Sequence, residues 1–96
     1  MTVKILIKRK YADSQAAQLE QMLIELRRQT VKQPGYVSGE TLQRLDRPGE
    51  TLVISTWESA DHWRQWTLNP ERGWVQERID ALLGTPTVYE IYAHRK

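Results

Sequence analysis

The sequence predicts an α+β domain with one four-stranded antiparallel sheet and helices between its strands. Val3, Ile5 and Ile7 occupy alternate positions, which is the period of a half-buried strand. A helical apolar stripe follows and stops before the pair Pro34-Gly35. Further on, two strand patterns flank a tight turn at residues 47–50. The length of 96 residues corresponds to a single domain over residues 1–96.

The first helix is expected between the first strand, residues 3–8, and Pro34. Asp13 or Ser14 can cap its start by accepting a hydrogen bond from a free N–H group. Its inward stripe consists of Ala16, Leu19, Leu23, Leu26 and Thr30, widened by Met22. Pro34 disfavours helical geometry at the residue before it, so the helix is expected to stop near Lys32.

A hairpin is expected next, with strands at residues 36–45 and 51–57. Pro48 presets the first central residue of a type II turn, and Gly49 accepts the positive φ of the second. The run Leu52-Val53-Ile54 is apolar at successive positions, which is typical of a strand covered on both faces. Helices on one side leave the other face of a four-stranded sheet open. We therefore expect the sheet of a second copy to cover it.

The second helix is expected in two pieces. Ser59 begins a short helix that runs to Leu68. Asn69 then caps a new helix with Pro70 at its first position, and Gly84 ends it. Residues 88–93 form the last strand. The order β-α-β-β-α-β is that of ferredoxin-like folds, here with a broken second helix.

Composition excludes several kinds of site. The chain has no Cys, so disulfides, thiolate metal sites and a cysteine nucleophile are excluded. His62 and His94 lie far apart and lack metal-ligand spacing, so no metal site is expected. The sequence has neither an apolar run of about 18 residues for a membrane span nor a signal-peptide pattern. A cytoplasmic protein that does not bind membranes is expected.

Charge gives no indication of a nucleic-acid partner. The net charge is only +2, and the longest basic cluster is Lys8-Arg9-Lys10. It lies where the first strand is expected to end, and so short a run is typical of solvent-exposed loop residues. A nucleic-acid interface requires a basic stripe with a docking element, and the sequence has neither.

Four residues are candidates for a binding site, since familiar catalytic motifs are absent. Trp57 ends a strand. Trp63 and Trp66 are three residues apart and therefore neighbours on the surface of one helix, where they can form the walls of an apolar pocket. The alternative is that these tryptophans fill the core of a domain without Phe. Gln76 lies at the edge of an inward helical stripe, where it faces either the space below the sheet or water.

His62 is a further candidate, because histidine can accept a proton near neutral pH. It lies four residues before Trp66 and hence on the same helical side. The alternative is a histidine that faces solvent.

Longer stretches resemble one known family. Residues 33–42, QPGYVSGETL, and residues 52–59, LVISTWES, are followed by Trp66 and by Asn69-Pro70. In this combination they resemble the antibiotic biosynthesis monooxygenase (ABM) domain family, and the similarity runs from Val3 to Tyr92. The resemblance implies a ferredoxin-like homodimer whose two sheets pack into a dimeric α/β barrel.

The resemblance also implies two kinds of activity. Some members resemble cofactor-independent oxygenases that oxidise aromatic polyketides or quinols with dioxygen and no metal. Their pocket contacts match Trp57, Trp63 and Gln76, although one such oxygenase has arginine at the last position. Other members resemble haem-degrading enzymes, with a histidine ligand matching Gln76, a tryptophan matching Trp66 and an asparagine on the first strand. This chain has Gln76 and no Asn in residues 3–8, which disfavours haem, although His62 can in principle substitute from another place.

We therefore expect a homodimer that needs no cofactor and oxygenates a small aromatic, quinol-like substrate with dioxygen. The three tryptophans form the walls, Gln76 and Arg72 contact the substrate oxygens, and His62 is the candidate base. A haem-degrading monooxygenase and a non-catalytic small-molecule-binding dimer remain as alternatives.

Overall fold

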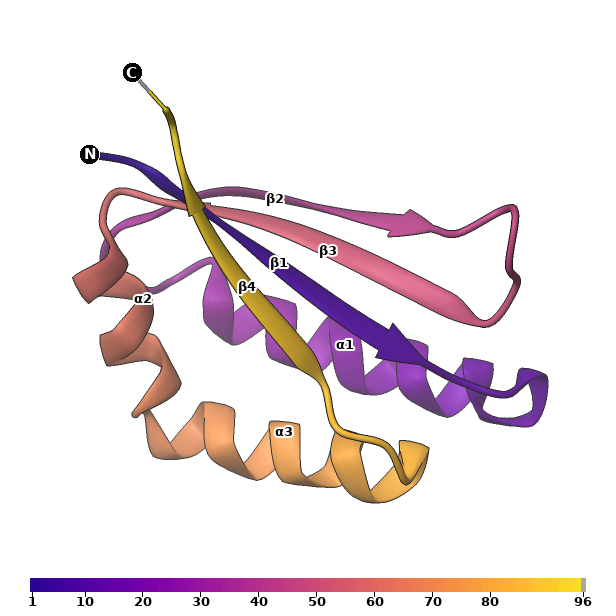
Figure 1. The fold of residues 1–96 in the computed structure, drawn as a ribbon. Helices are drawn as coiled ribbons and strands as arrows, with labels where there is room; N and C mark the ends of the chain where they lie inside the picture. Colours follow the sequence, from indigo (N-terminus) through magenta and orange to yellow (C-terminus); the bar gives the residue numbers. More distant parts are fainter. Residues whose placement is uncertain (96) are drawn as a thin grey trace.

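A computed structural model describes residues 1–95 of the chain. It shows one antiparallel four-stranded sheet in the order β2-β3-β1-β4 (Figure 1). The strands are β1 (Val3–Lys10), β2 (Tyr36–Gln43), β3 (Glu50–Trp57) and β4 (Val88–Ala93). The helices are α1 (Ala16–Thr30), α2 (Ala60–Thr67) and α3 (Pro70–Leu83). This confirms the predicted ferredoxin-like order, with a second helix broken at Asn69-Pro70.

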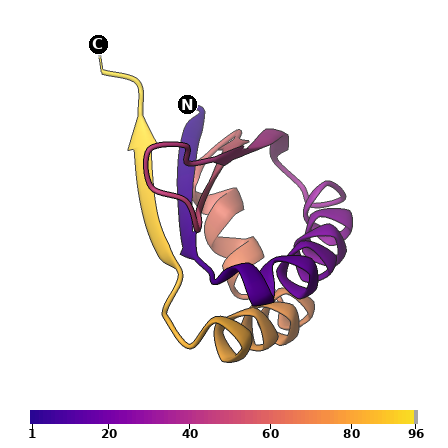
Figure 2. The same cartoon turned by 90° about the vertical axis from the view of Figure 1, so that its right-hand side faces the viewer.

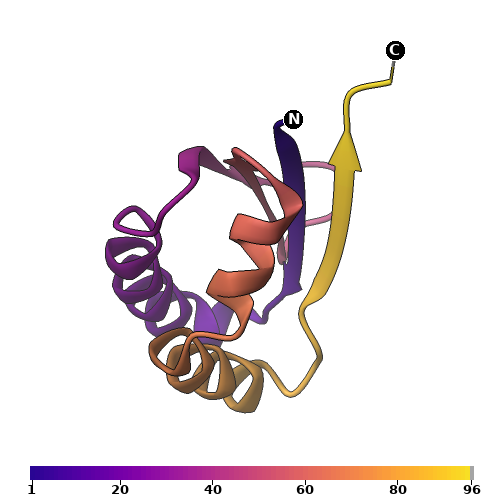
Figure 3. The ribbon, with the colours of Figure 1, turned by 90° about the vertical axis from the view of Figure 1, so that its left-hand side faces the viewer.

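All three helices cover one face of the sheet, as the two side views show (Figure 2 and Figure 3). The helices α1 and α3 lie side by side and share one apolar cluster, formed by Leu19, Val75, Ile79 and Leu83. Within residues 1–95, no helix is long and apolar enough to cross a membrane.

The local signals at the helix ends behave largely as predicted. Ser59 Oγ accepts a hydrogen bond from the His62 N–H (3.2 Å), and Asn69 Oδ1 accepts one from the Glu71 N–H (2.9 Å). Gly84 ends α3 in the left-handed conformation with φ of 67°. Gly49 has the positive φ that the sequence predicts for it (95°), within a bend over residues 45–49.

The start of the first helix differs from the prediction. Residues Asp13–Gln15 form a 3-10 turn, η1, and α1 begins at Ala16 without a side-chain cap. Gln15 takes over this end: its Oε1 accepts from the Ala12 N–H at 2.9 Å, and its Nε2 donates to the Leu82 carbonyl at 2.8 Å. The turn is thus tied to the end of α3, a contact that no local capping pattern reveals. At the other end α1 stops at Thr30, two residues earlier than expected.

Strand β1 corrects the expectation for the basic cluster. It continues two residues past its predicted end, with Lys8, Arg9 and Lys10 paired to residues of β3. Side chains alternate between the faces of a strand, so Arg9 shares the helix-covered face with Ile7. Arg9 is only 3% exposed, while Lys8 and Lys10 face the other way and are exposed. The middle residue of the cluster is therefore buried and not solvated.

The opposite face of the sheet carries no helix (Figure 2). Strand pairing places Leu6 beside Ile54, and Leu42 beside Leu52, on this outer face. In the run Leu52-Val53-Ile54, the middle residue packs against the helix-side core while its neighbours point outward. Leu52 and Ile54 are half-buried in the single chain.

The buried cluster under the sheet is centred on Trp57, which has 0% of its surface exposed. Its ring meets Tyr36 edge-on at 5.5 Å between centroids, and Trp63 at 5.7 Å. Its indole N–H donates to Ser55 Oγ at 2.7 Å, so the one polar atom of this buried side chain is satisfied.

We predict that Trp57→Ala lowers the free energy of unfolding by about 3–5 kcal/mol, because it removes a large buried aromatic side chain. Urea denaturation followed by circular dichroism measures this change. Trp74→Ala is the matched control, since Trp74 is 65% exposed. It should change the same quantity by no more than about 0.5 kcal/mol. Equal effects of the two substitutions would contradict the role of Trp57 in the core.

Candidate functional site

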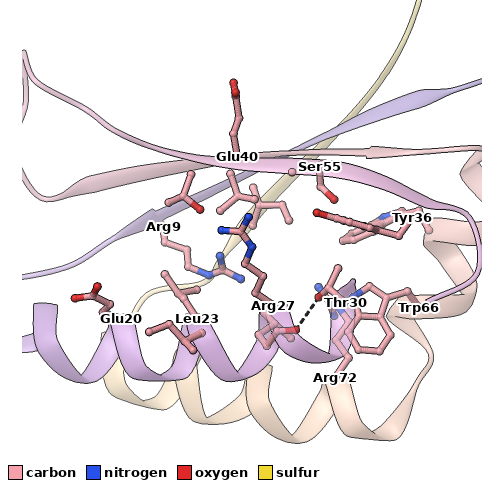
Figure 4. A pocket seen from close by; sticks show the side chains of 17 residues that line it. Arg9, Glu20, Leu23, Arg27, Thr30, Tyr36, Glu40, Ser55, Trp66 and Arg72 are labelled. Carbon is pink, nitrogen blue, oxygen red and sulfur yellow. Dashed lines mark hydrogen bonds between the residues drawn. The ribbon is translucent and has the colours of Figure 1, made fainter. Parts of the chain in front are cut away.

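A cavity of about 270 Å³ lies between the sheet and α1 (Figure 4). The sheet contributes residues from β1, β2 and β3, and the opposite wall comes from one side of α1. The tryptophans of α2 and the first turn of α3 close one end. All three helices therefore contribute residues to the lining of this cavity.

Aromatic side chains form the walls at that end. Trp63 and Trp66 lie one turn apart on α2, are both buried, and line the cavity. Tyr36 faces them from β2, and Figure 4 shows its hydroxyl pointing into the cavity. This orientation depends on Gly39, where a Cβ would stand 2.8 Å from the Tyr36 hydroxyl oxygen. This end of the cavity is therefore largely aromatic.

One buried hydroxyl supplies a polar group among these rings. Ser55 lies on β3, is buried, and lines the cavity. Its Oγ accepts a hydrogen bond from the Trp57 N–H, and its own O–H has no protein acceptor within residues 1–95. Ser55 can therefore donate a hydrogen bond to a molecule in the cavity.

Arg9 brings a cation into the cavity from β1. Its Nη2 donates to Gln76 Oε1 at 3.0 Å, and its buried Nε has no partner within the described residues. Burial lowers the pKa of the Arg9 guanidinium, and the nearby charge of Arg72 lowers it further. The ordinary pKa of arginine is so high that the group nevertheless stays positively charged.

Arg72 is the second buried cation and lies on α3, 7% exposed. Its Nη2 donates to the Tyr89 hydroxyl at 2.8 Å. Its guanidinium carbon lies 5.3 Å from the ring centroids of both Trp63 and Tyr89, which is the geometry of cation–π contacts. Arg72 is thus held between two rings at the edge of the cavity.

Gln76 does not line the cavity, because its amide is bonded within the protein. Its Oε1 accepts from Arg9, and its Nε2 donates to Asp80 Oδ1 and to Thr87 Oγ1, both at 2.9 Å. The residue is 8% exposed, so it does not face water either. Gln76 reaches the cavity only through Arg9, whose guanidinium it orients.

Two other candidates also lie outside the lining of the cavity. Trp57 lies behind Tyr36 and Trp63 and supports both rings. The ring of His62 packs over Gly35, where a Cβ would stand 2.2 Å from the His62 Cγ. The His62 Nδ1 lies 2.7 Å from Ser59 Oγ. The structure therefore brings Trp63, Trp66 and Arg72 to the cavity, but not Trp57, Gln76 or His62.

Sequence reasoning missed the charged side of the cavity, to which Arg9 and Arg27 both contribute. A signal for Arg9 was present: it continues the alternation of Val3, Ile5 and Ile7 in phase. Arg27 follows the inward-facing Leu23 by one helical turn, and the same spacing rule would have identified it. Metal ligands are a different matter. Over residues 1–95, no group of three or more His, Cys, Asp or Glu side chains could hold a metal ion.

We predict that Gln76→Leu lowers the free energy of unfolding by about 1–3 kcal/mol, because it leaves the buried guanidinium of Arg9 without its hydrogen-bond partner. Urea denaturation measures the loss. Gln65→Leu is the control, since Gln65 is exposed on α2 and should change stability by no more than about 0.5 kcal/mol. An unchanged stability of Gln76→Leu would show that the buried network does not contribute to folding.

Comparison with solved structures supports the fold. A conserved protein from Methanosarcina mazei Go1 has a TM-score of 0.91 and 15% identity, over 99% of this chain and 94% of that chain. SnoaB, described as a cofactor-independent oxygenase from Streptomyces nogalater, has a TM-score of 0.84 and 18% identity over the same shares of the two chains. At these identities the likeness establishes the fold alone.

Comparison at the level of sequence is more specific. No match to a curated protein sequence was found. The family model for antibiotic biosynthesis monooxygenase, however, matches residues 2–78, which include β1 to α2 and most of α3. The chain belongs to the antibiotic biosynthesis monooxygenase (ABM) family.

Proposed function

We propose that this protein is a cofactor-independent monooxygenase that acts on a small aromatic or quinol-like substrate. The observation that carries the proposal is the cavity under the sheet, where aromatic walls and guanidinium groups meet in a member of the ABM family. SnoaB, which shares the fold, is described as a cofactor-independent oxygenase, and this also supports the proposal.

Such a reaction requires no external reductant. A quinol and dioxygen give a hydroxyquinone and water, and all the electrons needed come from the quinol itself. The ionised quinol is the form that gives up an electron to dioxygen. A catalyst must therefore hold the ring, stabilise the anion and keep bulk water away from the intermediates.

The residues around the cavity suit these tasks. Trp63, Trp66 and Tyr36 offer flat apolar surfaces for a ring. The cations Arg72 and Arg9 favour the ionised form of a bound quinol, because nearby positive charge lowers the pKa of an acidic group. A quinol can then lose its proton to solvent as it binds, before water is excluded from the later intermediates, so the reaction needs no histidine base. We therefore assign no role in the proposed reaction to His62, whose ring packs over Gly35.

The haem-degrading alternative has less support. No histidine is among the residues that line the cavity in the described part of the chain. The amide of Gln76 is bonded to three neighbours, and glutamine is in any case a poor ligand for haem iron.

We predict protein-dependent dioxygen uptake with at least one member of a panel of naphthalene and anthracene quinols, measured with an oxygen electrode in the presence of a chelator. Arg72→Gln should lower this rate about tenfold or more, since it removes a charge that stabilises the anion. Arg64→Gln is the control, because Arg64 is exposed on α2 and pairs with Asp61. It should leave the rate unchanged.

Two outcomes would contradict the proposed reaction. Uptake no faster than autoxidation for every quinol would favour the non-catalytic binding dimer. A sharp Soret band with one haem per chain, lost in His62→Ala, would favour the haem-degrading alternative.

We further infer that the protein is a homodimer, with the outer face of the sheet as its interface. This face carries the apolar residues Leu6, Leu42, Leu52, Ile54, Val88 and Tyr92, and no element of the described chain covers it. In a two-fold symmetric dimer the same face of a second copy covers this one, so that apolar residues of both sheets contact one another. An obligate interface of this kind buries about 2,000 Å² or more in total. The cytoplasmic location remains a prediction from the sequence.

We predict a dimer at micromolar concentration by light scattering coupled to gel filtration. Ile54→Lys should produce a folded monomer, because it places a charge at the centre of the proposed interface. Trp74→Lys makes the same kind of change on the exposed side of α3 and should leave the dimer intact. A monomeric wild-type protein, or equal dissociation in both variants, would contradict this interface.

A further inference from the structure

Three guanidinium groups converge on the cavity, from β1, α1 and α3. They belong to Arg9, Arg27 and Arg72. Figure 4 shows the Arg27 side chain rising from α1 toward the sheet, beside the guanidinium of Arg9. Within residues 1–95, every ion pair involves other side chains. No carboxylate of the described residues thus forms an ion pair with any of these three arginines.

This arrangement is costly for a protein without a ligand. A buried charge loses its hydration and is usually compensated by an opposite charge. Arg9 instead donates to the neutral amide of Gln76, and its Nε is buried without a partner. Arg72 donates to a phenol and lies over two rings. Both residues retain the capacity to bind an anion.

The nearby acids do not fill this role. Glu40 lines the cavity in part, but Figure 4 shows its carboxylate above the sheet, pointing away from the arginines. Glu20 lies at the rim and forms no ion pair with a residue of the described chain. Asp80 lies behind Gln76, and its Oδ1 accepts from Gln76 and Thr87. It steadies Gln76 and does not reach into the cavity.

We propose that the cavity binds an aromatic carboxylic acid, with the carboxylate between Arg9 and Arg27 and the ring against Trp63 and Trp66. This inference rests on the proposed function in that it names the substrate class for the same cavity. A carboxylate matches the planar fork of a guanidinium, and such pairs form the strongest hydrogen bonds available to a protein. A cavity of about 270 Å³ suits a small aromatic acid.

The carboxylate also determines how the ring is oriented. Bound at Arg9 and Arg27, it leaves the ring oxygens to the other polar groups of the cavity, Arg72 and Ser55. Arg9 and Arg27 are then specificity residues, whereas Gln76 is a positioning residue that acts through Arg9. A neutral quinol of the same shape would lack this anchor.

The first test compares two probes of the same shape on the wild-type protein. Binding of 2-naphthoate and of the neutral 2-naphthamide is measured under nitrogen by quenching of tryptophan fluorescence, and confirmed by calorimetry. Naphthoate should bind about tenfold more tightly or better, because charge-assisted hydrogen bonds to arginine replace neutral ones. Equal affinity for the two probes would overturn the proposal.

The second test uses adjacent arginines of α1, both exposed, so that the overall charge changes equally. Arg27 lines the cavity and Arg28 does not. Arg27→Gln should weaken naphthoate binding about fivefold or more and leave naphthamide binding within about twofold. Arg28→Gln should leave both affinities within about twofold. Equal losses of naphthoate affinity in the two variants would show a general effect of charge and would contradict the site.

Arg9→Met probes the buried cation and should abolish the preference for naphthoate. Circular dichroism checks the fold of this variant. If it does not fold, the comparison of Arg27→Gln with Arg28→Gln tests the proposal by itself.

Failure of this inference is distinguishable from failure of the proposed oxygenation. The binding measurements need no turnover, so a preference for naphthoate without dioxygen uptake by quinols that carry a carboxylate supports the acid site and contradicts the oxygenase. Dioxygen uptake with neutral quinols, together with equal binding of naphthoate and naphthamide, supports the oxygenase and contradicts the acid site.

Discussion

The pairing of β1 with β3 on one side and β4 on the other is the constraint on which the rest of the structure depends. Because side chains alternate along a strand, this pairing directs Val3, Ile5 and Ile7 into the core and forces Arg9 to follow them. A slip by one residue would turn three apolar side chains toward the outer face and Lys8 toward the helices. The burial of the apolar residues therefore stabilises the position of a cation that would not be buried for its own sake.

The buried cation in turn organises polar residues that lie far apart in the sequence. Arg9 on β1 meets Gln76 on α3, and Gln76 holds Asp80 and Thr87. A buried polar network stabilises a fold only when its members are satisfied, and here the unpaired Nε of Arg9 leaves it incomplete. Arg9 also lines the cavity. Stability and binding thus impose opposite requirements on this residue, and a bound anion would meet both.

The aromatic residues form two layers, an inner one that supports other rings and an outer one that lines the cavity. Trp57 is completely buried and supports Tyr36 and Trp63, while the outer layer of Trp63 and Trp66 faces the cavity. All three tryptophans belong to one buried cluster, and Trp63 and Trp66 also line the cavity. Trp57 holds the rings of Tyr36 and Trp63 in place before a ligand binds. Binding free energy is therefore not spent on ordering these side chains.

The sequence by itself determined the elements and their order, because these depend on interactions between residues close along the chain. The alternation in β1, the turn at Pro48-Gly49 and the restart at Asn69-Pro70 each act over a few residues. The same local rules failed at Asp13–Gln15, where Gln15 bonds to the distant end of α3.

Half of the predicted site residues proved to lie at the cavity, namely Trp63, Trp66 and Arg72. Only the tertiary structure decided that Trp57 is covered by other rings, that His62 packs over Gly35, and that Gln76 is turned toward Arg9, 67 residues away in sequence. Which side chains meet depends on the order of the strands and on the packing of α1 against α3. Those contacts arise between segments that no short window of sequence contains.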